Sequence, residues 1–493
     1  MHIPRLFTKT HSDPYHDQRF VEGLPISYGK QDPVTPILVP DTWSQIAIDI
    51  LGTKYMRKTG VPQPNGELGA ETDARQVFRR LADCWMYWGL KEGYFDSDEE
   101  AQSFSDEMQY MLSHQIGAPN SPQWFNTGLH HVYGIAGPAQ GLWRHDLKTG
   151  ATTETLNAYE HAQASACFIQ SISDSLLNEG GIMSLWEREA RLFKYGSGSG
   201  TNFSALRGRG EKLSGGGTSS GLMSWLKIGD AAAGAIKSGG TTRRAAKMVI
   251  LNIDHPDIEE FINLKVKEDQ KVAALMVGSH LFANHLTRIM QTVWITEGTN
   301  EFAQPNPQFN TSLAEALRQA RHHRIPETYI QRALSFAQRD QRTFAFSTYD
   351  LGWEGEAYQS VTGQNANNSI RITKAFLDTV ATDGDWALLN RTDGHVAKTV
   401  KARDLWNQIC AAAWQCADPG IQYDDIINDW HTTPAQGRIN GSNPCVSGDT
   451  YVATENGWQQ IQDIIGNNLS ILGSDGRLHP AQDIFLTGCK RLY

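Results

Sequence analysis

Cysteines are the residues of this chain best suited to chemistry, and their surroundings differ. Cys445 stands in the loop-forming stretch GRINGSNPC, which keeps a thiol accessible without setting its pKa. An incidental loop thiol and a reactive one therefore both stay open at this point. Cys84 falls on the apolar stripe of a helical pattern and is predicted to pack in a core. The 6 cysteines are too scattered for a disulfide scaffold and form no CxxC pair, so we expect no structural metal.

Two glycine-rich stretches could approach a phosphate group. YGSGSGTNFS looks like a dinucleotide fingerprint, but it is expected to follow a helix and precede a strand, which is the wrong order. A nicotinamide oxidoreductase is therefore disfavoured. KSGGTTRRAAKM places Arg243 and Arg244 after a glycine turn, where two guanidinium groups could hold an anion. A surface loop with solvated charges explains that spacing equally well.

Helices are predicted before residue 117, over 42–58, over 71–90 and from Asp98 onward. Strands and helices then alternate. SACFIQSI, TNFSALRG and KMVILNI read as strands, and GIMSLWEREARLFKYG and LMSWLKIGDAAAGAIKSGG as helices, the second capped by Ser219 or Ser220 and ended by Gly239. HPDIEEFINLKVKE, polar helical hairpins in 300–345 and ARDLWNQICAAAWQCADPG complete the helical set. This alternation predicts an α/β architecture with parallel strands.

The pattern changes at Cys445, after which short strands and tight turns predict a β-rich segment. We therefore expect three regions: a largely helical one over 1–117, an α/β one over 118–444 and the β-rich one over 445–493.

Composition bounds the class of protein. With 40% hydrophobic and 20% charged residues, the 493-residue chain is typical of a globular protein. We see neither an apolar run long enough for a bilayer nor a secretory signal, so the expected compartment is the cytoplasm, without a membrane partner. A net charge of -10 argues against a nucleic-acid partner but not against nucleotides.

Six motifs occur in one order along the chain: QASACFIQSISDSL, KYGSGSGTNFSALRG, KSGGTTRRAAKMVILNIDHPDIEEFI, QNANNSIRIT, CADPGIQYDDIINDWH and GSNPC. Together they resemble the long-form, adenosylcobalamin-dependent ribonucleotide reductases, from about Pro119 to Cys445. The resemblance implies a ten-stranded α/β barrel with a central finger loop, and the reduction of ribonucleotides to deoxyribonucleotides. It also implies adenosylcobalamin, a dithiol reductant of the thioredoxin kind and a possible homodimer.

The resemblance also implies roles for individual residues. Cys445 matches the finger-loop cysteine that becomes a thiyl radical, and Asn443 the asparagine that bonds the ribose hydroxyls. Cys167 matches one of two thiols that reduce the 2′-carbon and end as a disulfide. The implied substrate-binding residues are Ser165, Ala166, Ser121 and Gly200.

Further residues match the family's regulatory elements. Asp174 corresponds to the acid that holds a deoxynucleoside triphosphate effector, and Arg243 and Arg244 fall in the loop that links effector to substrate. Cys410 and Cys416 match no redox position, and we expect both to pack along an amphipathic helix.

The chain departs from this family after Cys445, where the family continues with Pro-Cys-Ser-Glu and uses the glutamate as a base. Here CVSGDTYVATENGWQQIQDI resembles the opening block of a hedgehog/intein-type intein. Cys445 would then be the nucleophile of an N–S acyl shift, and a residue downstream of the intein would supply the thiyl cysteine.

These resemblances lead us to expect a reductase fragment that carries the first part of an intein, needs the rest of the gene product or a complementing intein half, and is inactive alone. The rival reading is a splicing half whose reductase segment is a passenger. Iron-dependent relatives share the finger loop, so cobalamin dependence stays open on the residues present, as does the choice between diphosphate and triphosphate substrates.

Overall fold

The computed structural model describes residues 2–9, 11, 13–25, 35–139, 141–146, 148–238, 243–297, 300–339, 341, 345–349 and 356–442. It describes the backbone alone of 237–238, 243–244, 296–297, 300–301, 451–454, 457–460, 469–472 and 478–481. The chain forms two compact units. The first comprises 1–258, 365–406 and 419–493, and the second comprises 259–364 and 407–418. The bounds of these two units do not coincide with those of the three expected regions, which stay a prediction.

Helices dominate the start of the first unit, as predicted. They are α1 (Gln45–Ile50), continued by a π-helical turn η1 (Leu51–Tyr55), then α2 (Ala74–Lys91) and α3 (Asp98–Ser113). Asp73 and Gln76 cap α2 reciprocally, and Ser97 caps α3, whose first turn is acidic. An apolar cluster of α2 residues packs with the strand β2 (Ile37–Pro40) and Trp124. Cys84 is buried in α2, as expected.

Short elements complete this region. They are β1 (Phe20–Gly23), β3 (Val61–Pro62), β4 (Leu68–Gly69), α4 (Ser121–Asn126), α5 (Leu129–Tyr133), β5 (Trp143–His145) and β6 (Thr152–Glu154). The strand pairs β1–β2, β3–β4 and β5–β6 are antiparallel.

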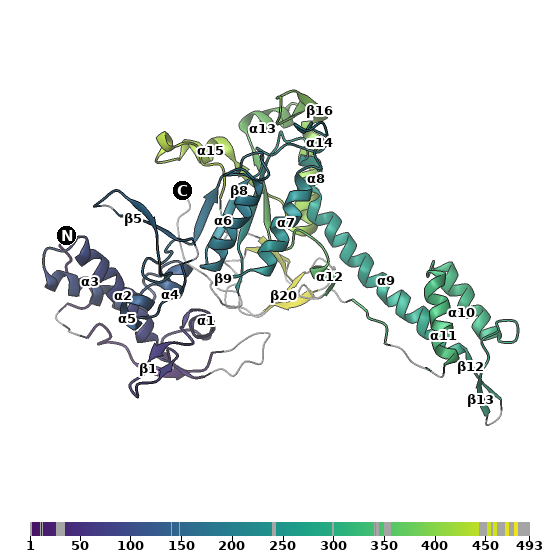
Figure 1. Ribbon diagram of the computed structural model, residues 1–493, viewed down its shortest axis with the longest axis horizontal. Helices are drawn as coiled ribbons and strands as arrows, with labels where there is room; N and C mark the ends of the chain where they lie inside the picture. Colours follow the sequence, from purple (N-terminus) through teal and green to yellow (C-terminus); the bar gives the residue numbers. More distant parts are fainter. Residues whose placement is uncertain are drawn as a thin grey trace. The chain divides into compact units, whose positions relative to one another are not determined.

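A five-stranded parallel sheet forms the centre of the first unit (Figure 1), which confirms the predicted α/β class. Its order is β17-β14-β11-β8-β7, from β7 (Cys167–Gln170), β8 (Gly198–Asn202), β11 (Lys247–Asn252), β14 (Asn367–Ile372) and β17 (Gly420–Tyr423). The strands follow one another in sequence order, as in successive βαβ units. Closure into a ten-stranded barrel stays a prediction.

Helices α6 (Ile182–Lys194) and α7 (Leu222–Ala235) lie against one face of this sheet (Figure 1). Under them, Glu189 of α6 accepts a 2.7 Å hydrogen bond from Ser199 and pairs with the buried Lys247. Burial lowers the pKa of Lys247, and the charge of Glu189 opposes that shift. The first unit also holds α13 (Lys374–Ala381) and α15 (Asp424–Asp429), with the hairpin β15 (Asp385–Leu389) and β16 (Val396–Lys401). Helices α8 (Ile258–Ile262) and α14 (Ala402–Cys416) begin in the first unit and continue in the second.

Three local predictions need correction. The strand expected at TNFSALRG lies earlier, at Gly198–Asn202, so the glycine-rich stretch is itself a buried strand. The N-cap of α7 is Gly221, and the carboxylate that receives its first amide belongs to Asp257, not to Ser219 or Ser220. The helix ends at Ala235, and Gly239 lies outside the described residues.

The arginine pair was expected in a loop. The backbone of β10 (Arg243–Arg244) instead pairs antiparallel with β9 (Lys237–Ser238), in a two-stranded ribbon. The turn between the two strands, 239–242, lies outside the described residues.

The second unit has a helical core of its own. Helix α9 (Leu264–Thr292) packs on α10 (Thr311–His322) and α11 (Glu327–Gln338). In the described part of 300–345, α10 and α11 form one helical hairpin where several were expected. A buried cluster that includes Ile289, Leu313 and Ile330 joins the three helices. The unit also holds α12 (Glu356–Gln359) and the hairpin β12 (Trp294–Glu297) and β13 (Asn300–Ala303). On α14, Cys410 is exposed, so the expectation that it packs is wrong, while Cys416 is partly buried.

Beyond residue 450 the described backbone is an antiparallel sheet of order β19-β18-β20-β21. Its strands are β18 (Tyr451–Thr454), β19 (Gly457–Gln460), β20 (Leu469–Leu472) and β21 (Leu478–Ala481). The predicted change to β-rich structure is thus present. Nowhere in the described ranges does a helix combine the length and the apolar character needed to cross a membrane.

Candidate functional site

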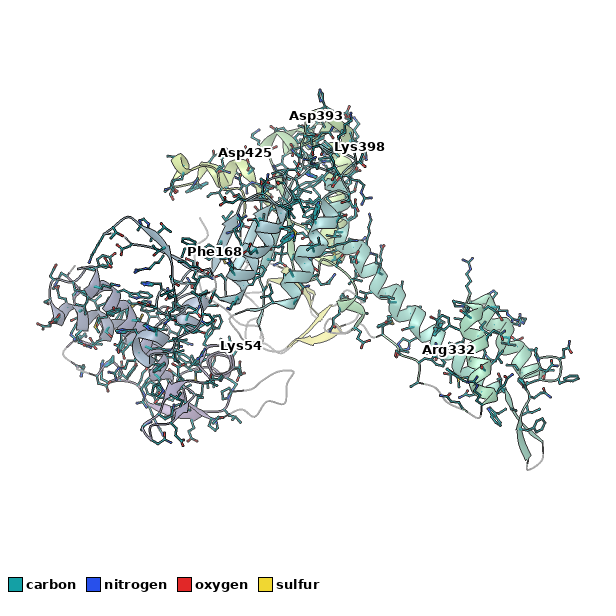
Figure 2. The ribbon with its side chains drawn as sticks, viewed as in Figure 1. Lys54, Phe168, Arg332, Asp393, Lys398 and Asp425 are labelled. Carbon is teal, nitrogen blue, oxygen red and sulfur yellow. The ribbon has the colours of Figure 1, made fainter. Side chains whose placement is uncertain are left out.

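The two faces of the parallel sheet differ in chemistry. Residues paired between parallel strands point to the same side, so Cys167, Gly198 and Met248 mark one face and Phe168 and Lys247 the other. Figure 2 labels Phe168 on β7. Phe168 shares its face with Lys247, which pairs with Glu189 of α6. We call the face that carries Cys167 the open face. Its residues are small or polar in most positions: Gly198, Gly200, Asn202, Asn252, Ser369, Arg371, Gly420 and Gln422.

The polar members of the open face gather near the carboxyl ends of their strands, where ligands of open parallel sheets bind. Asn202 Nδ2 donates to Asn252 Oδ1 at 2.9 Å, which joins β8 to β11. Arg371 Nη1 donates to Gln422 Oε1 at 3.2 Å, which joins β14 to β17.

These side chains hold the segment that leads to Asn443 and Cys445. Arg371 is 3% exposed and donates to the carbonyl of Ile439. Asn202 Nδ2 donates to the carbonyl of Asn440 at 3.1 Å, and Gln422 Nε2 donates to Ser442 Oγ at 3.0 Å. Three strands therefore hold residues 439–442 by hydrogen bonds, two of them to backbone carbonyls.

Asp424 and Asn428 of α15 also act on this segment. We call the side chains that hold residues 438–442 the clamp: Asn202, Arg371, Gln422, Asp424 and Asn428. Asp424 pairs with Arg371 through Oδ1 and with Arg438 through Oδ2 at 2.5 Å. Burial raises the pKa of Asp424, but hydrogen bonds and charge from both arginines outweigh it and leave that pKa below its ordinary value. Asn428 accepts the amide of Ile439 at 2.9 Å and donates to its carbonyl at 3.2 Å. Figure 2 labels the neighbouring Asp425, which accepts the amide of Lys374 at 2.6 Å.

Gly441 lies directly on the open face. It is buried, and a Cβ added to it would stand 2.8 Å from Ile250 Cδ1 and 3.6 Å from Ile169 Cγ2. Ile169 is two residues beyond Cys167 on β7 and shares its face. The chain that leads to Asn443 thus passes over the strand that begins with Cys167.

The structure places Cys167 at the start of an edge strand, with an exposed side chain. Ser165 and Ala166 precede it: Ser165 is exposed, its carbonyl accepts from Ser197 Oγ at 2.5 Å, and the carbonyl of Ala166 accepts from the Gly198 amide at 2.6 Å. Gly200 is buried in β8, opposite Ile169. The structure therefore places four of the predicted site residues on or beside the paired strands β7 and β8: Ser165, Ala166, Cys167 and Gly200.

Ser121 lies at the first position of α4, and its hydroxyl is 3.2 Å from that of Tyr55. The same helix reaches the sheet through Asn126, whose amide donates to the carbonyl of Tyr195 at 3.1 Å, three residues before β8. No described hydrogen bond joins Ser121 itself to the open face.

The predicted effector residues are not brought to this clamp. Asp174 follows β7 and accepts from Arg207 Nε at 2.6 Å, with both side chains about a quarter exposed. Of Arg243 and Arg244 only the backbone is described, and Asn443 and Cys445 lie outside the described residues.

Sequence reasoning missed Arg371, Asn202, Gln422 and Asn428 as site residues. All four lie inside motifs that it used, KYGSGSGTNFSALRG, QNANNSIRIT and CADPGIQYDDIINDWH. An arginine inside a strand otherwise made of Asn, Ser and Ile was the available signal, because an unpaired charge is rarely buried there.

Comparisons with known proteins agree with this arrangement. The family model described as ribonucleotide reductase, barrel domain, matches residues 165–448, and the one described as class II vitamin B12-dependent ribonucleotide reductase matches 33–115. A vitamin B12-dependent ribonucleotide reductase of Agrobacterium fabrum is 51% identical over 477 residues, covering 90% of this chain and 37% of the relative.

Two further relatives show how widely the sequence identity varies. The Bradyrhizobium diazoefficiens vitamin B12-dependent ribonucleotide reductase is 53% identical over 435 residues, 83% of this chain and 35% of the relative. A vitamin B12-dependent ribonucleoside-diphosphate reductase of Mycobacterium tuberculosis is 26% identical over 280 residues, 57% of this chain. The chain spans about a third of the length of the first two relatives.

Proposed function

Because the chain belongs to the class II vitamin B12-dependent ribonucleotide reductase family, we propose that its open face forms part of the site where a ribonucleotide is reduced to a 2′-deoxyribonucleotide. The observation that carries the proposal is the segment 439–442, held across the strand ends above the strand of Cys167. A thiol on the sheet and a thiol delivered by that segment would then flank one bound ribose.

Each thiol has a distinct task in this scheme. A thiyl radical at the finger-loop cysteine takes the 3′-hydrogen of the ribose, and the 2′-hydroxyl leaves as water. Cys167 and a second thiol together give up two protons and two electrons and become a disulfide. One proton leaves with the 2′-hydroxyl as the water, and the other proton and the two electrons form the new C–H bond at the 2′-carbon. The 3′-hydrogen finally returns from the finger-loop thiol, which regenerates the radical, and an external dithiol of the thioredoxin kind reduces the disulfide.

The clamp explains why such a loop must be held rigidly. Hydrogen transfer needs reacting atoms at near-contact distance, and displacements of about 1 Å can cost about a hundredfold in rate. Arg371, Asn202 and Asn428 are positioning residues, since they hold the backbone that leads to Asn443 and Cys445. Gly198 and Gly200 leave the open face without side chains at two positions beside Cys167, where a nucleotide could lie.

Adenosylcobalamin, the form of vitamin B12 that we propose, supplies the first radical when bound. The described residues do not by themselves define its site. The cavities lined by Cys84 and by Arg321 include neither Cys167 nor Gly441. We therefore assign no residue of the described ranges to the cofactor.

Protection of Cys167 from alkylation tests the substrate site. Ribonucleoside diphosphate or triphosphate should slow the reaction of Cys167 with iodoacetamide in proportion to occupancy, as followed by mass spectrometry of the 493-residue chain. Cys410 is the matched control, because it is also exposed but lies on α14. Equal labelling of Cys167 with and without either nucleotide would remove it from the substrate site. The nucleotide that slows the alkylation of Cys167 more strongly would indicate whether the substrate is a diphosphate or a triphosphate.

Asp174 is proposed to take part in an effector site for a deoxynucleoside triphosphate. Its ion pair with Arg207 would have to open or be shared when a ligand arrives. Calorimetry with deoxynucleoside triphosphates should show weaker binding to Asp174→Ala than to the unchanged chain. Equal binding by both proteins would exclude Asp174. A homodimer that completes this site, and a role for Arg243 and Arg244 beside it, belong to the same proposal.

A second candidate function is protein splicing. What favours it is that the barrel model ends at residue 448, while the described backbone after residue 450 changes from a parallel to an antiparallel sheet. In this proposal Cys445 attacks the preceding carbonyl, so that the Pro444–Cys445 amide becomes a thioester and its nitrogen becomes a free amine.

Co-expression with a complementing intein half should release residues 1–444 joined to the segment that follows the intein. Cys445→Ala should abolish that release, whereas Cys489→Ala should not. Efficient splicing by Cys445→Ala would remove Cys445 as the splicing nucleophile, and an absence of release from the unchanged chain would contradict the intein assignment and return Cys445 to the finger loop. Neither result would change the protection expected at Cys167, so the two proposed functions fail separately.

A further inference from the structure

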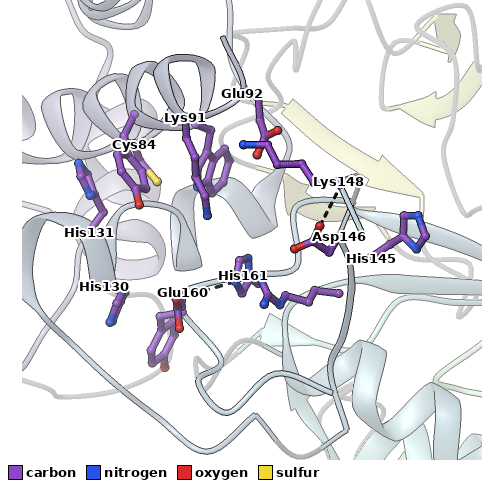
Figure 3. Close-up of a pocket in the computed structure, with 14 residues that line it drawn as sticks. Cys84, Lys91, Glu92, His130, His131, His145, Asp146, Lys148, Glu160 and His161 are labelled. Atoms are coloured by element: carbon purple, nitrogen blue, oxygen red, sulfur yellow. Dashed lines mark hydrogen bonds and ion pairs between the residues drawn. The ribbon is translucent and has the colours of Figure 1, made fainter. Parts of the chain in front are cut away.

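A cavity of about 450 Å³ lies in the N-terminal part of the first unit (Figure 3). Four stretches line it: the last turns of α2, the start of α5, β5 with the turn that follows it, and residues 159–161. None of its lining residues belongs to the open face. Its volume falls in the ordinary range for a small-molecule site.

Three permanent cations line this cavity: Lys91 on α2, and Arg144 and Lys148 on β5 and its turn. In the part of the chain that the structure describes, none of the three forms an ion pair with a carboxylate. Arg144 Nη1 instead lies 3.3 Å from Nε2 of His161, so a neutral imidazole accepts from the guanidinium. A cation that relies on such a weak partner keeps most of its capacity to bind an anion.

The carboxylates of the cavity do not neutralise these cations directly. Asp146 accepts the amides of Lys148 and Thr149 at 2.9 Å, and so serves its own turn. Glu160 is 3.9 Å from His161, with half of its side chain exposed. Glu92 follows the last turn of α2 and is exposed. The amides of Thr149 and Lys148 lower the pKa of Asp146, and the charge of Arg144 lowers it further, so Asp146 stays charged. No described ion pair joins Asp146 to Arg144, whose guanidinium lies against His161.

The cavity's histidines respond to this positive field. Burial lowers the pKa of His161, the charges of Arg144, Lys91 and His130 lower it further, and Glu160 opposes them. Burial also lowers the pKa of His131, with help from His130 and opposition from Asp83. A bound anion would reverse the repulsion and favour protonated histidine.

Four histidines in one cavity could suggest a metal. Within the described ranges, however, no three His, Cys, Asp or Glu side chains gather closely enough to hold one. Cys84 also lines the cavity, and burial raises the pKa of its thiol to about 11, so it stays protonated. His145 is engaged with Thr152 Oγ1 at 3.0 Å, and His131 stacks on Tyr87 with ring centroids 4.2 Å apart.

We propose that this cavity is a binding site for a phosphate-bearing anion, held by Lys91, Arg144 and Lys148 with His161 as a proton-linked fourth donor. Phosphate oxygens accept hydrogen bonds from guanidinium and ammonium groups, and Arg144 can turn toward them when His161 takes a proton. The phosphoryl groups could come from a free polyphosphate or from a nucleotide, whose base would meet the rings of Tyr87, Trp88 and Tyr159.

Titration of tripolyphosphate into the 493-residue chain tests the site. Binding should raise the pKa of His161, read from its imidazole resonances and assigned with His161→Gln. Affinity should therefore increase as the pH falls from about 8 to about 6, because the bound form takes up a proton. Arg144→Gln and Lys91→Ala should each weaken binding by about tenfold or more, the loss expected for one charge-assisted contact.

Arg79→Gln is the matched control, since Arg79 lies on the same helix α2, 74% exposed and paired with Asp83. Lys91 is exposed, so Lys91→Ala leaves the fold intact even if Arg144→Gln does not. An unmoved His161 resonance, or equal binding by Lys91→Ala and Arg79→Gln, would overturn the proposal. Adenosine triphosphate in a parallel titration identifies the source: tighter binding than tripolyphosphate indicates a nucleotide, and equal binding indicates phosphoryl groups alone.

Discussion

Asp424 receives two guanidinium groups, from Arg371 and Arg438, and this pairing makes the clamp sensitive to acid. Its pKa in the folded protein lies below the ordinary value of about 3.9. Such a group stabilises the fold fully above its unfolded pKa, and the contribution is lost as the pH falls through the folded pKa. The contribution of Asp424 should therefore be complete at neutral pH and disappear below about pH 4.

Urea unfolding of the unchanged protein and of Asp424→Asn tests this pH dependence. The difference in unfolding free energy between the two should be largest near neutral pH and should shrink toward about pH 3. Asp378→Asn is a suitable control, because its pair with Lys374 is exposed on both sides. A difference for Asp424→Asn that stays constant over the whole pH range would contradict the prediction.

Single residues were predictable where local pattern decides. Cys84 on its apolar stripe and Cys167 in a strand both lie as expected. Arg371 was missed because its partners Asp424 and Ile439 are 53 and 68 residues away, and no local pattern contains them. Cys410 was expected to pack along α14, yet it is exposed there, because an amphipathic pattern does not show which flank of the helix is covered.

At the scale of elements, α2 is joined to the end of α4 by the buried Arg80, which donates to two carbonyls there and also forms an ion pair with Glu71. Arg80 and Glu71 are both fully buried and pair at 2.7 Å. Arg80 also donates to the carbonyls of Trp124 and Thr127, each at 2.8 Å, while Tyr133 donates to Glu71 at 2.9 Å. If the guanidinium is removed, Glu71 loses its counter-charge and the carbonyls of Trp124 and Thr127 lose their hydrogen bonds.

Arg80→Met should therefore cost about 3 to 5 kcal/mol of unfolding free energy, since Glu71 would remain as a buried charge without a cation. Arg79→Met, one residue away in an exposed pair, should cost less than about 1 kcal/mol. Urea denaturation followed by tryptophan fluorescence measures both. Equal losses for the two variants would show that the buried network is not the main link between α2 and α4.

The N-terminus of α7 is capped by a residue distant in the sequence and not by the serines beside it. Ser219 and Ser220 were the local candidates, but Asp257 accepts the amides of Leu222 and Arg209 at 2.8 and 2.9 Å. Asp257→Ala should cost about 0.5 to 2 kcal/mol, as for the loss of an N-cap. Ser220→Ala should be nearly neutral in the same unfolding assay. A larger loss from Ser220→Ala than from Asp257→Ala would restore the local cap.

The glycine-rich strand β8 shows why strand positions were harder to predict than helices. Glycine disfavours strands, so TNFSALRG appeared the better candidate. The real strand is Gly198–Asn202, because its neighbours on both sides pair with it and Gly441 crosses its open face. Glycine is needed in this strand because another backbone passes close to it, and that contact involves residues distant in the sequence. Local strand propensity therefore does not predict it.

At the scale of the whole molecule, each of the two units has an apolar cluster of its own among the described residues. In the first unit, an apolar cluster around Val77, Phe78 and Leu81 packs among helices and strands before residue 125. In the second, the cluster around Ile289, Leu313 and Ile330 draws only on residues between 282 and 346. The order of strands and helices predicted the α/β class, but the division into these units was not predictable, because the residues 365–406 and 419–493 return to the first unit.

Separate cores should unfold in separate transitions, because each unit loses its buried surface within itself. Ile330 is fully buried in the second unit, so Ile330→Ala should lower one transition by about 2 to 5 kcal/mol and leave the other unchanged. Leu81→Ala, fully buried in the first unit, should do the reverse. Calorimetry gives the two transitions, and amide hydrogen exchange assigns each to α11 or α2. One transition that both substitutions shift equally would show that the two cores unfold as a single cooperative unit.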